Sequence, residues 1–231
     1  NIDASRGSEA AVSVTGKGDT TIELDGDNEL KSGAGHAGLE HNKTDTSGEL
    51  TIQDKDNNGS LEAAGGFKGA GIGSAGSNDA QVKITGGNIT ATTSDDWGAG
   101  IGSGSYGTGT VEITGGEINA TGGYLGAGIG GGCNGSGNVT ISGGTITAAG
   151  SDGAAGIGGG YYNGATVTIT GDAVIKNASS TKYGAGIGGG NGSDGNVTIS
   201  GNAKIENATG GYGAAGIGGG AFSSPDKIGN G

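Results

Sequence analysis

Aromatic residues recur about once per repeat along this chain, and their spacing makes them the strongest candidates for binding chemistry. One set comes shortly before a recurring Ala-Gly-Ile tripeptide or its variant, and a second set follows it. The candidate ligand-binding residues in the two sets are Trp97, Tyr106, Tyr124, Tyr161, Tyr162, Tyr183 and Tyr212, and Phe67 and Phe222 complete the sets. Since the C–H faces of sugars pack on aromatic rings, the pattern predicts a polysaccharide or cell-surface glycan as the ligand.

The middle glycine of each tripeptide is expected to face outward, because neighbouring residues on a strand alternate between its two sides. A row of such glycines would form a flat floor without side chains, with aromatic rings along both margins. Two alternatives stay open. The rings could simply stack on one another and stabilise a corner of the fold, or the glycine floor could let another chain dock closely.

Three aspartates lie at the same corners as the aromatic residues. Asp95 and Asp96 stand beside Trp97, and Asp152 occupies an equivalent corner further along. They could contact a bound glycan, or they could hydrolyse one, which requires two carboxylates on opposite sides of the bond. A lyase would need a basic residue to abstract a proton, but the only arginine is Arg6 and the lysines are scattered. We therefore expect solvated turn carboxylates, with a hydrolase or lyase as the alternative.

A short polar segment resembles a calcium-binding loop. Asp54, Asp56 and Asn58 occupy its first, third and fifth positions, and Gly59 occupies the sixth. Position twelve is Gly65 where such a loop carries glutamate, so an ordinary Asx-rich turn is the alternative. Calcium is the one cofactor that the sequence suggests.

Rows of Thr-x-Thr or Thr-x-Ser are expected to point outward from consecutive strands. The rows are Thr140 and Ser142, Thr168 and Thr170, and Thr198 and Ser200. Stacked threonines can form the flat array that ice-binding proteins use, but Lys83 and Glu112 interrupt the column and threonine is common on strand surfaces. We therefore do not expect ice binding.

Histidine and cysteine offer little chemistry. His36 and His41 flank Leu39 without a third ligand nearby, so they are expected to be surface residues and not a zinc site. Cys133 lies in a glycine turn without a neighbouring base, so no nucleophilic role is predicted for it.

The elements that position these residues follow from three repeated apolar columns. The Ala-Gly-(Ile/Leu) anchors are Leu39, Ile72, Ile101, Ile129, Ile157, Ile187 and Ile217, spaced 28 to 30 residues apart from the second anchor onward. Apolar-x-apolar triplets form a second column at residues 12–14, 50–52, 82–84, 111–113, 139–141, 167–169 and 197–199. A third column is expected at Ile22, Leu61, Ile89, Ile118, Ile146, Ile175 and Ile205. A fixed period with three β-patterned segments indicates a solenoid, because no repeat alone can bury its apolar side chains.

The predicted fold is therefore an all-β, single-domain, right-handed parallel β-helix of about seven coils, with three short strands per coil. We expect one domain over 1–231, with an irregular N-terminal capping coil at 1–49 and regular coils at 50–221. The segment 222–231 is expected to be a C-terminal tail that could be truncated from a longer protein.

Composition narrows the range of partners. The formal net charge is −12 with few basic residues, which disfavours nucleic acid because tracking phosphates requires clustered lysine and arginine. No stretch is apolar enough for membrane insertion, and a single cysteine excludes an intrachain disulfide framework. The oligomeric state stays open.

Two glycine-rich blocks carry a resemblance to a known group of proteins. They are Gly-Asn-Val-Thr-Ile-Ser-Gly-Gly at 137–144 and Gly-Ala-Gly-Ile-Gly-Gly-Gly at 126–132 and 184–190. They resemble the glycine-rich β-helix segments of bacterial cell-surface and adhesin-like proteins, over roughly residues 49 to 221. The resemblance implies an extracellular or cell wall-attached location. We therefore expect a non-enzymatic adhesin or carbohydrate-binding domain, with a polysaccharide-active enzyme or a purely structural spacer as the alternatives.

Overall fold

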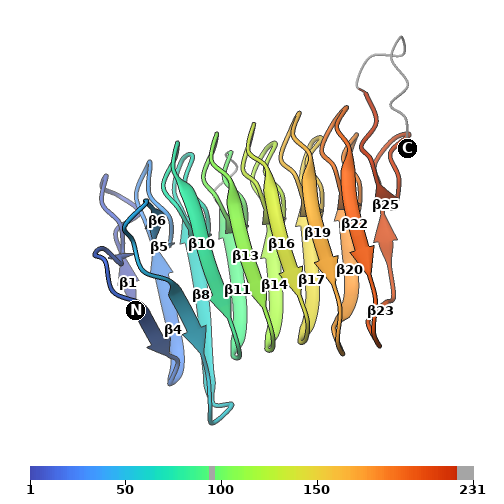
Figure 1. Cartoon of the computed structure of the whole chain (residues 1–231). Coiled ribbons are helices and arrows are strands. Elements are labelled where there is room, and N and C mark those ends of the chain that lie inside the picture. The colour runs from blue at the N-terminus through green and yellow to red at the C-terminus, as the bar shows by residue number, and fades with distance from the viewer. Residues whose placement is uncertain (94–96, 223–231) are drawn as a thin grey trace.

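The computed structural model describes residues 1–93 and 97–222, which form a β-solenoid of about seven turns without a helix. Three parallel sheets run along its length, and each full turn contributes strands to sheets A, B and C in that order. The turns stack side by side from the N-terminal end to the C-terminal end (Figure 1). The predicted all-β solenoid is confirmed. No helix in the described part of the chain could span a membrane.

The strands are short and keep the same order in every turn. Sheet A contains β1 (Ile2–Asp3), β4 (Gly26–Lys31), β8 (Gly59–Gly65), β11 (Asn88–Thr93), β14 (Glu117–Thr121), β17 (Thr145–Gly150), β20 (Val174–Ser180), β23 (Lys204–Ile205) and β24 (Ala208–Thr209). Sheet B contains β2 (Val12–Ser13), β5 (Leu39–Glu40), β9 (Ile72–Gly73), β12 (Ile101–Gly102), β15 (Ile129–Gly130), β18 (Ile157–Gly158), β21 (Ile187–Gly188) and β25 (Ile217–Gly218). Sheet C contains β3 (Thr20–Glu23), β7 (Leu50–Gln53), β10 (Asp79–Ile84), β13 (Gly109–Ile113), β16 (Gly137–Ile141), β19 (Ala165–Ile169) and β22 (Gly195–Ile199), and β6 (Asn42–Lys43) pairs antiparallel with β10.

The core is a stack of aliphatic side chains held in register. Ile129 pairs with Ile101 on one side and with Ile157 on the other, and all three are fully buried. The strands of sheets A and C alternate between buried and more exposed residues, as a strand with one face on the core must. Each turn therefore covers the apolar residues of its neighbours.

Two early segments belong to other columns than the sequence suggested. Val12 pairs with Leu39 in sheet B, so it is the first anchor and not the first member of the apolar-x-apolar column. Ile22 pairs with Ile52 in sheet C, and Asn28 is the true partner of Leu61 in sheet A. Both assignments were wrong because the loops of the first turns differ in length, which removes the fixed spacing that identifies a column.

The Ala-Gly-Ile anchors form a tight arch around six strands of sheet B, namely β9, β12, β15, β18, β21 and β25. In the arch at residues 127–131, the backbone N–H of Ala127 donates to the carbonyl of Gly131 at 3.0 Å, and the same bond joins Ala155 to Gly159. Gly130 has a φ of +129°, which glycine adopts readily because it has no Cβ. The glycine after each isoleucine is thus required for the chain to turn back.

The outward glycine floor that the sequence predicted does not exist. Gly128 is buried, and a Cβ added to it would lie 2.7 Å from the backbone nitrogen of Ala149 in β17. Gly100 is buried in the same way, 2.7 Å from the nitrogen of Thr121. The C-terminal ends of the sheet A strands cover this side of the arch, so no ligand can lie along it.

Candidate functional site

A shallow basin on the side of the solenoid brings together several of the candidate residues. Its volume is about 250 Å³, and it is lined by Tyr124, Leu125, Asp152, Tyr161, Lys182, Tyr183 and Asn191. Typical small-molecule pockets measure about 300–1,000 Å³. The basin therefore suits contact with part of a larger ligand better than enclosure of a small molecule.

The loops on the two sides of the arch build the basin. Tyr124, Asp152 and Tyr183 come from loops that lead into sheet B, whereas Tyr161 and Asn191 come from loops that leave it. The backbone N–H of Tyr161 donates to the carbonyl of Leu125 at 3.1 Å. The two kinds of loop are therefore hydrogen-bonded neighbours. The two aromatic sets lie side by side, whereas the sequence analysis placed them on opposite margins of a glycine floor.

An ion pair lies within the basin. Nζ of Lys182 is 2.6 Å from Oδ1 of Asp152, and the Asp152 side chain is 18% exposed while that of Lys182 is 49% exposed. The hydrogen bond to Asp152 raises the pKa of the Lys182 ammonium, so this group stays charged at neutral pH. The backbone N–H of Asp152 donates to Oγ1 of Thr181 at 2.9 Å, which holds the loop in place. The basin thus offers a donor and an acceptor whose charges offset each other.

Ring contacts extend the aromatic surface beyond the basin. The ring centroids of Tyr161 and Tyr162 lie 3.9 Å apart with planes tilted by 48°. Tyr183 and Tyr212 lie 6.3 Å apart, and Tyr212 is 72% exposed. Five of the seven aromatic candidates therefore line the basin or contact a ring that lines it.

The other two aromatic candidates do not line the basin. Trp97 lies 5.8 Å from Phe67 between ring centroids, and the ammonium of Lys68 lies 5.1 Å from the Phe67 ring and 5.3 Å from that of Trp97. Tyr106 is exposed on a loop of an earlier turn. The rings of Phe67 and Trp97 lie in neighbouring turns with planes tilted by 45°, a contact that fits the alternative in which aromatic residues stabilise a corner.

In the described part of the chain, the acidic candidates do not form a catalytic pair of carboxylates. Asp95 and Asp96 lie outside the residues that the structure describes. Among the residues that it does describe, Asp152 is the only carboxylate lining the basin, and it is paired with Lys182. Three further lining residues, Leu125, Lys182 and Asn191, were not singled out from the sequence. Lys182 could have been found, since it follows Asp152 by about one coil.

A separate acidic cluster includes two of the three predicted calcium ligands. Carboxylate oxygens of Glu23, Asp54 and Asp56 all lie within 4.8 Å of one another. The sequence missed Glu23, which comes from the preceding turn and pairs with Gln53 in sheet C. Asn58 lies in the same loop, and its side chain is exposed.

Hydrogen bonds already occupy much of this cluster. Asp54 accepts from the backbone N–H groups of Asn58 and Gly59, at 3.2 and 3.0 Å. Glu23 accepts from the backbone N–H of Lys55 and from the side-chain amide of Gln53, both at 2.7 Å. Asp54 therefore closes its own loop through N–H groups four and five residues further on, which fits the polar turn considered as the alternative from the sequence. Asp56, the third carboxylate of the cluster, is exposed.

Comparison with known proteins supports the repeat architecture. Four segments match a family model described as a beta helix repeat, at residues 82–105, 111–133, 139–161 and 197–221. The chain is a β-solenoid that contains beta helix repeats. Each matched segment starts in a strand of sheet C and ends just after the arch, so it covers most of one turn. No curated protein and no solved structure matched the chain.

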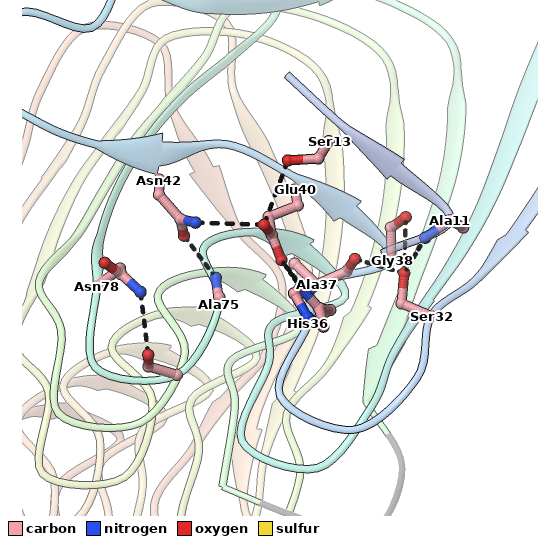
Figure 2. Close-up of polar contacts among 11 residues, drawn as sticks. Ala11, Ser13, Ser32, His36, Ala37, Gly38, Glu40, Asn42, Ala75 and Asn78 are labelled. Carbon is pink, nitrogen blue, oxygen red and sulfur yellow. Dashed lines mark hydrogen bonds and ion pairs between the residues drawn. The ribbon is translucent and has the colours of Figure 1, made fainter. Parts of the chain in front are cut away.

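The histidines of this solenoid have structural roles. The prediction of a surface position is wrong for His41, which is 2% exposed, with Nε2 2.9 Å from the carbonyl of Gly48. His36 Nδ1 lies 2.7 Å from Oε2 of the buried Glu40. Figure 2 shows that Ser13 and Asn42 also point at the Glu40 carboxylate, and both donate to its Oε1, at 3.3 and 3.2 Å. His36, Ser13 and Asn42 thus provide hydrogen-bond partners for the buried carboxylate of Glu40 in the early turns.

Cys133 is buried, which raises the pKa of its thiol to about 11. A thiol in this state is a poor nucleophile near neutral pH, because the thiolate is the reactive form. The absence of a nucleophilic role for Cys133 stays a prediction, which its burial favours.

The outer face of sheet C carries the threonine rows. Shallow grooves of about 300 and 360 Å³ run between them, lined mainly by threonine, asparagine and glycine. Lys83 and Glu112, which interrupt the column, form an ion pair at 3.3 Å. These grooves have neither aromatic rings nor a charge pair between facing loops, so the basin is the better candidate site.

Proposed function

We propose that this β-solenoid is a non-enzymatic, carbohydrate-binding domain of an extracellular or cell wall-attached bacterial protein, acting as an adhesin segment. The basin at Tyr124, Asp152, Tyr161, Lys182 and Tyr183 is the proposed contact site for a polysaccharide or cell-surface glycan. The observation that carries the proposal is the meeting of the two aromatic sets around one ion pair.

The chemistry of the basin suits a sugar. Tyrosine rings offer apolar faces for sugar C–H groups. The carboxylate of Asp152 can accept from hydroxyl groups, and the ammonium of Lys182 can donate to them. Because the basin is open and spans several turns, a chain of sugars can enter and leave along the surface.

The same features favour binding over catalysis. Hydrolysis of a glycosidic bond requires an acid and a second carboxylate across the bond. The basin presents one carboxylate among the described residues, and that carboxylate is paired with Lys182. The loops are fixed by backbone hydrogen bonds between turns, which limits the entropy lost when a ligand binds.

Replacing Tyr124 or Tyr161 by alanine is expected to weaken glycan binding by about 1–3 kcal/mol, as for a central aromatic contact. A glycan array with the intact chain would identify a ligand, and titration calorimetry would measure the affinity of each variant. Tyr106→Ala is the matched control, because Tyr106 is exposed but does not line the basin. Equal losses in all three variants would contradict the assignment of the site. Failure to bind any glycan would support the alternative of a structural spacer. Release of reducing ends from a glycan would support the alternative of a polysaccharide-active enzyme.

Calcium binding is a second proposal, supported by the convergence of Glu23, Asp54 and Asp56. Three carboxylates from two turns would repel one another, and a divalent cation would remove that repulsion. Asn58 would add an amide oxygen from the same loop.

If calcium binds there, the melting temperature should rise with the concentration of free calcium by mass action. Asp56→Asn is expected to abolish this rise while leaving the turn intact, because Asp54 keeps its two backbone hydrogen bonds. Asp79→Asn, at another exposed aspartate, is the control. Identical melting curves of the parent chain in excess calcium and in a chelator would exclude the site.

A further inference from the structure

The two ends of the solenoid expose the edges of all three sheets. Strands β1, β2 and β3 are the outermost strands at the N-terminal end, and β22, β23, β24 and β25 are outermost at the C-terminal end. We call these two surfaces the N-terminal face and the C-terminal face. Among the described residues, no strand pairs with their outer edges. Such edges present backbone N–H and C=O groups that can pair with another strand.

Apolar residues of the core columns are exposed on both faces. On the C-terminal face, Ile199 is 39% exposed and Ile217 is 43% exposed, whereas Ile129 in the same column as Ile217 is fully buried. On the N-terminal face, Ile2 is 46% exposed. Within residues 1–93 and 97–222, no further turn covers these side chains in the way that their equivalents are covered elsewhere in the stack.

The N-terminal face is also hollow. A cavity of about 280 Å³ opens there, and its lining is predominantly apolar. The apolar lining residues are Ile2, Val12, Ile22, Leu24, Leu30, Leu39 and Leu61. The core of the first turn therefore has room for apolar side chains from an additional turn.

We propose that the C-terminal face of one copy of this chain docks on the N-terminal face of the next copy and continues all three sheets. The two faces are complementary because each is one side of the same repeated stacking contact. In every turn, the strand of a given sheet pairs in parallel with its equivalent in the next turn, and the junction would repeat that pairing.

The register of the columns fixes which residues meet at the junction. Following each column from end to end places Ile217 on Val12, Ile199 on Ile22 and Ala208 on Ile2. All three contacts are apolar, and they lie over the cavity of the N-terminal face. The isoleucines of one copy would fill the space that the first turn of the next copy leaves open.

The polar residues beside these contacts are compatible with the same register. Thr198 would lie on Thr21 and Thr209 on Asp3, so no like charges are placed opposite each other at these positions. Because the two faces differ, the contact is head-to-tail and does not close on itself. Such a contact produces linear assemblies of increasing length.

Analytical ultracentrifugation of the 231-residue chain tests this proposal with two charge variants. Ile2→Asp blocks the N-terminal face and Ile217→Asp blocks the C-terminal face, each at an exposed position where a single copy should still fold. The parent chain is expected to show a series of oligomers that lengthens with protein concentration. Each variant alone is expected to be monomeric, since every junction needs one face of each kind. An equimolar mixture is expected to give dimers and nothing longer, because each variant retains one intact face.

Tyr106→Asp is the matched control, since it places the same charge on an exposed site between the two ends. It should assemble like the parent chain, and circular dichroism should show the same β spectrum for all variants. A parent chain that is monomeric at every concentration would overturn the proposal. A closed dimer that both variants form equally well would overturn it too, as would variants that assemble like the parent. A variant that does not fold is replaced by Ile199→Asp or Val12→Asp on the corresponding face.

Discussion

Replacing Ile129 by alanine is expected to lower the free energy of unfolding by about 2–5 kcal/mol. Ile129 is fully buried and lies in register between Ile101 and Ile157, so the lost methyl and methylene groups leave a cavity in the middle of the stack. Repeats on both sides hold the backbone in place, which limits how far the site can collapse. Equilibrium unfolding in urea, followed by circular dichroism, would measure the loss.

Ile217→Ala is the control for this substitution. Ile217 belongs to the same column but is 43% exposed at the C-terminal end, so its truncation is expected to cost much less in a single copy. Measurements at low protein concentration keep the proposed end-to-end contact from contributing. Equal losses for the two variants would contradict the assignment of Ile129 to a closed core column.

Gly130→Ala is expected to cost more than about 3 kcal/mol, although it adds a single methyl group. Positive φ alone costs a non-glycine residue about 1–3 kcal/mol. In addition, the new Cβ would lie 2.1 Å from the carbonyl oxygen of Gly158, which accepts the hydrogen bond from Gly131. Relief of that overlap would require the arches of two turns to separate. The melting temperature and the urea midpoint should both fall.

Gly16→Ala separates the two causes. Gly16 has nearly the same φ, +127°, but nothing lies within 4 Å of a Cβ added there. It is expected to show only the backbone cost of about 1–3 kcal/mol. If Gly130→Ala is no more destabilising than Gly16→Ala, the close packing of the arches is not what requires glycine.

The regular turns could be predicted from the sequence because each column repeats one apolar residue at a nearly constant interval. The pairings of Ile101 with Ile129 and of Val111 with Val139 follow directly from that interval. The first turns lack it, and there the columns of Val12 and Ile22 were misassigned. A Val-x-Val triplet and a single isoleucine do not by themselves indicate which sheet they join.

The residues of the candidate site were found in part, for a similar reason. Tyrosines at repeated positions had to stack on the same side of the solenoid, and Asp152 had to stand near them. The loops before and after the arch are neighbours because a backbone hydrogen bond closes the arch, such as that from Ala127 N–H to the carbonyl of Gly131. The tripeptide sequence does not reveal this bond. Glu23 joined Asp54 and Asp56 only because sheet C aligns residues about thirty positions apart.

By itself, the sequence determined that this chain is a β-solenoid, a stack of turns made of parallel strands around a narrow aliphatic core. Side chains alternate along a strand and the repeat length is constant, so equivalent isoleucines can all be buried only if the turns stack in register. Tertiary structure alone decided the path of the glycine-rich arch, the burial of Gly128 against the end of sheet A, and the meeting of the two aromatic sets. Glycine permits many backbone paths, so only the packing of one turn against the next selects the path that the chain takes.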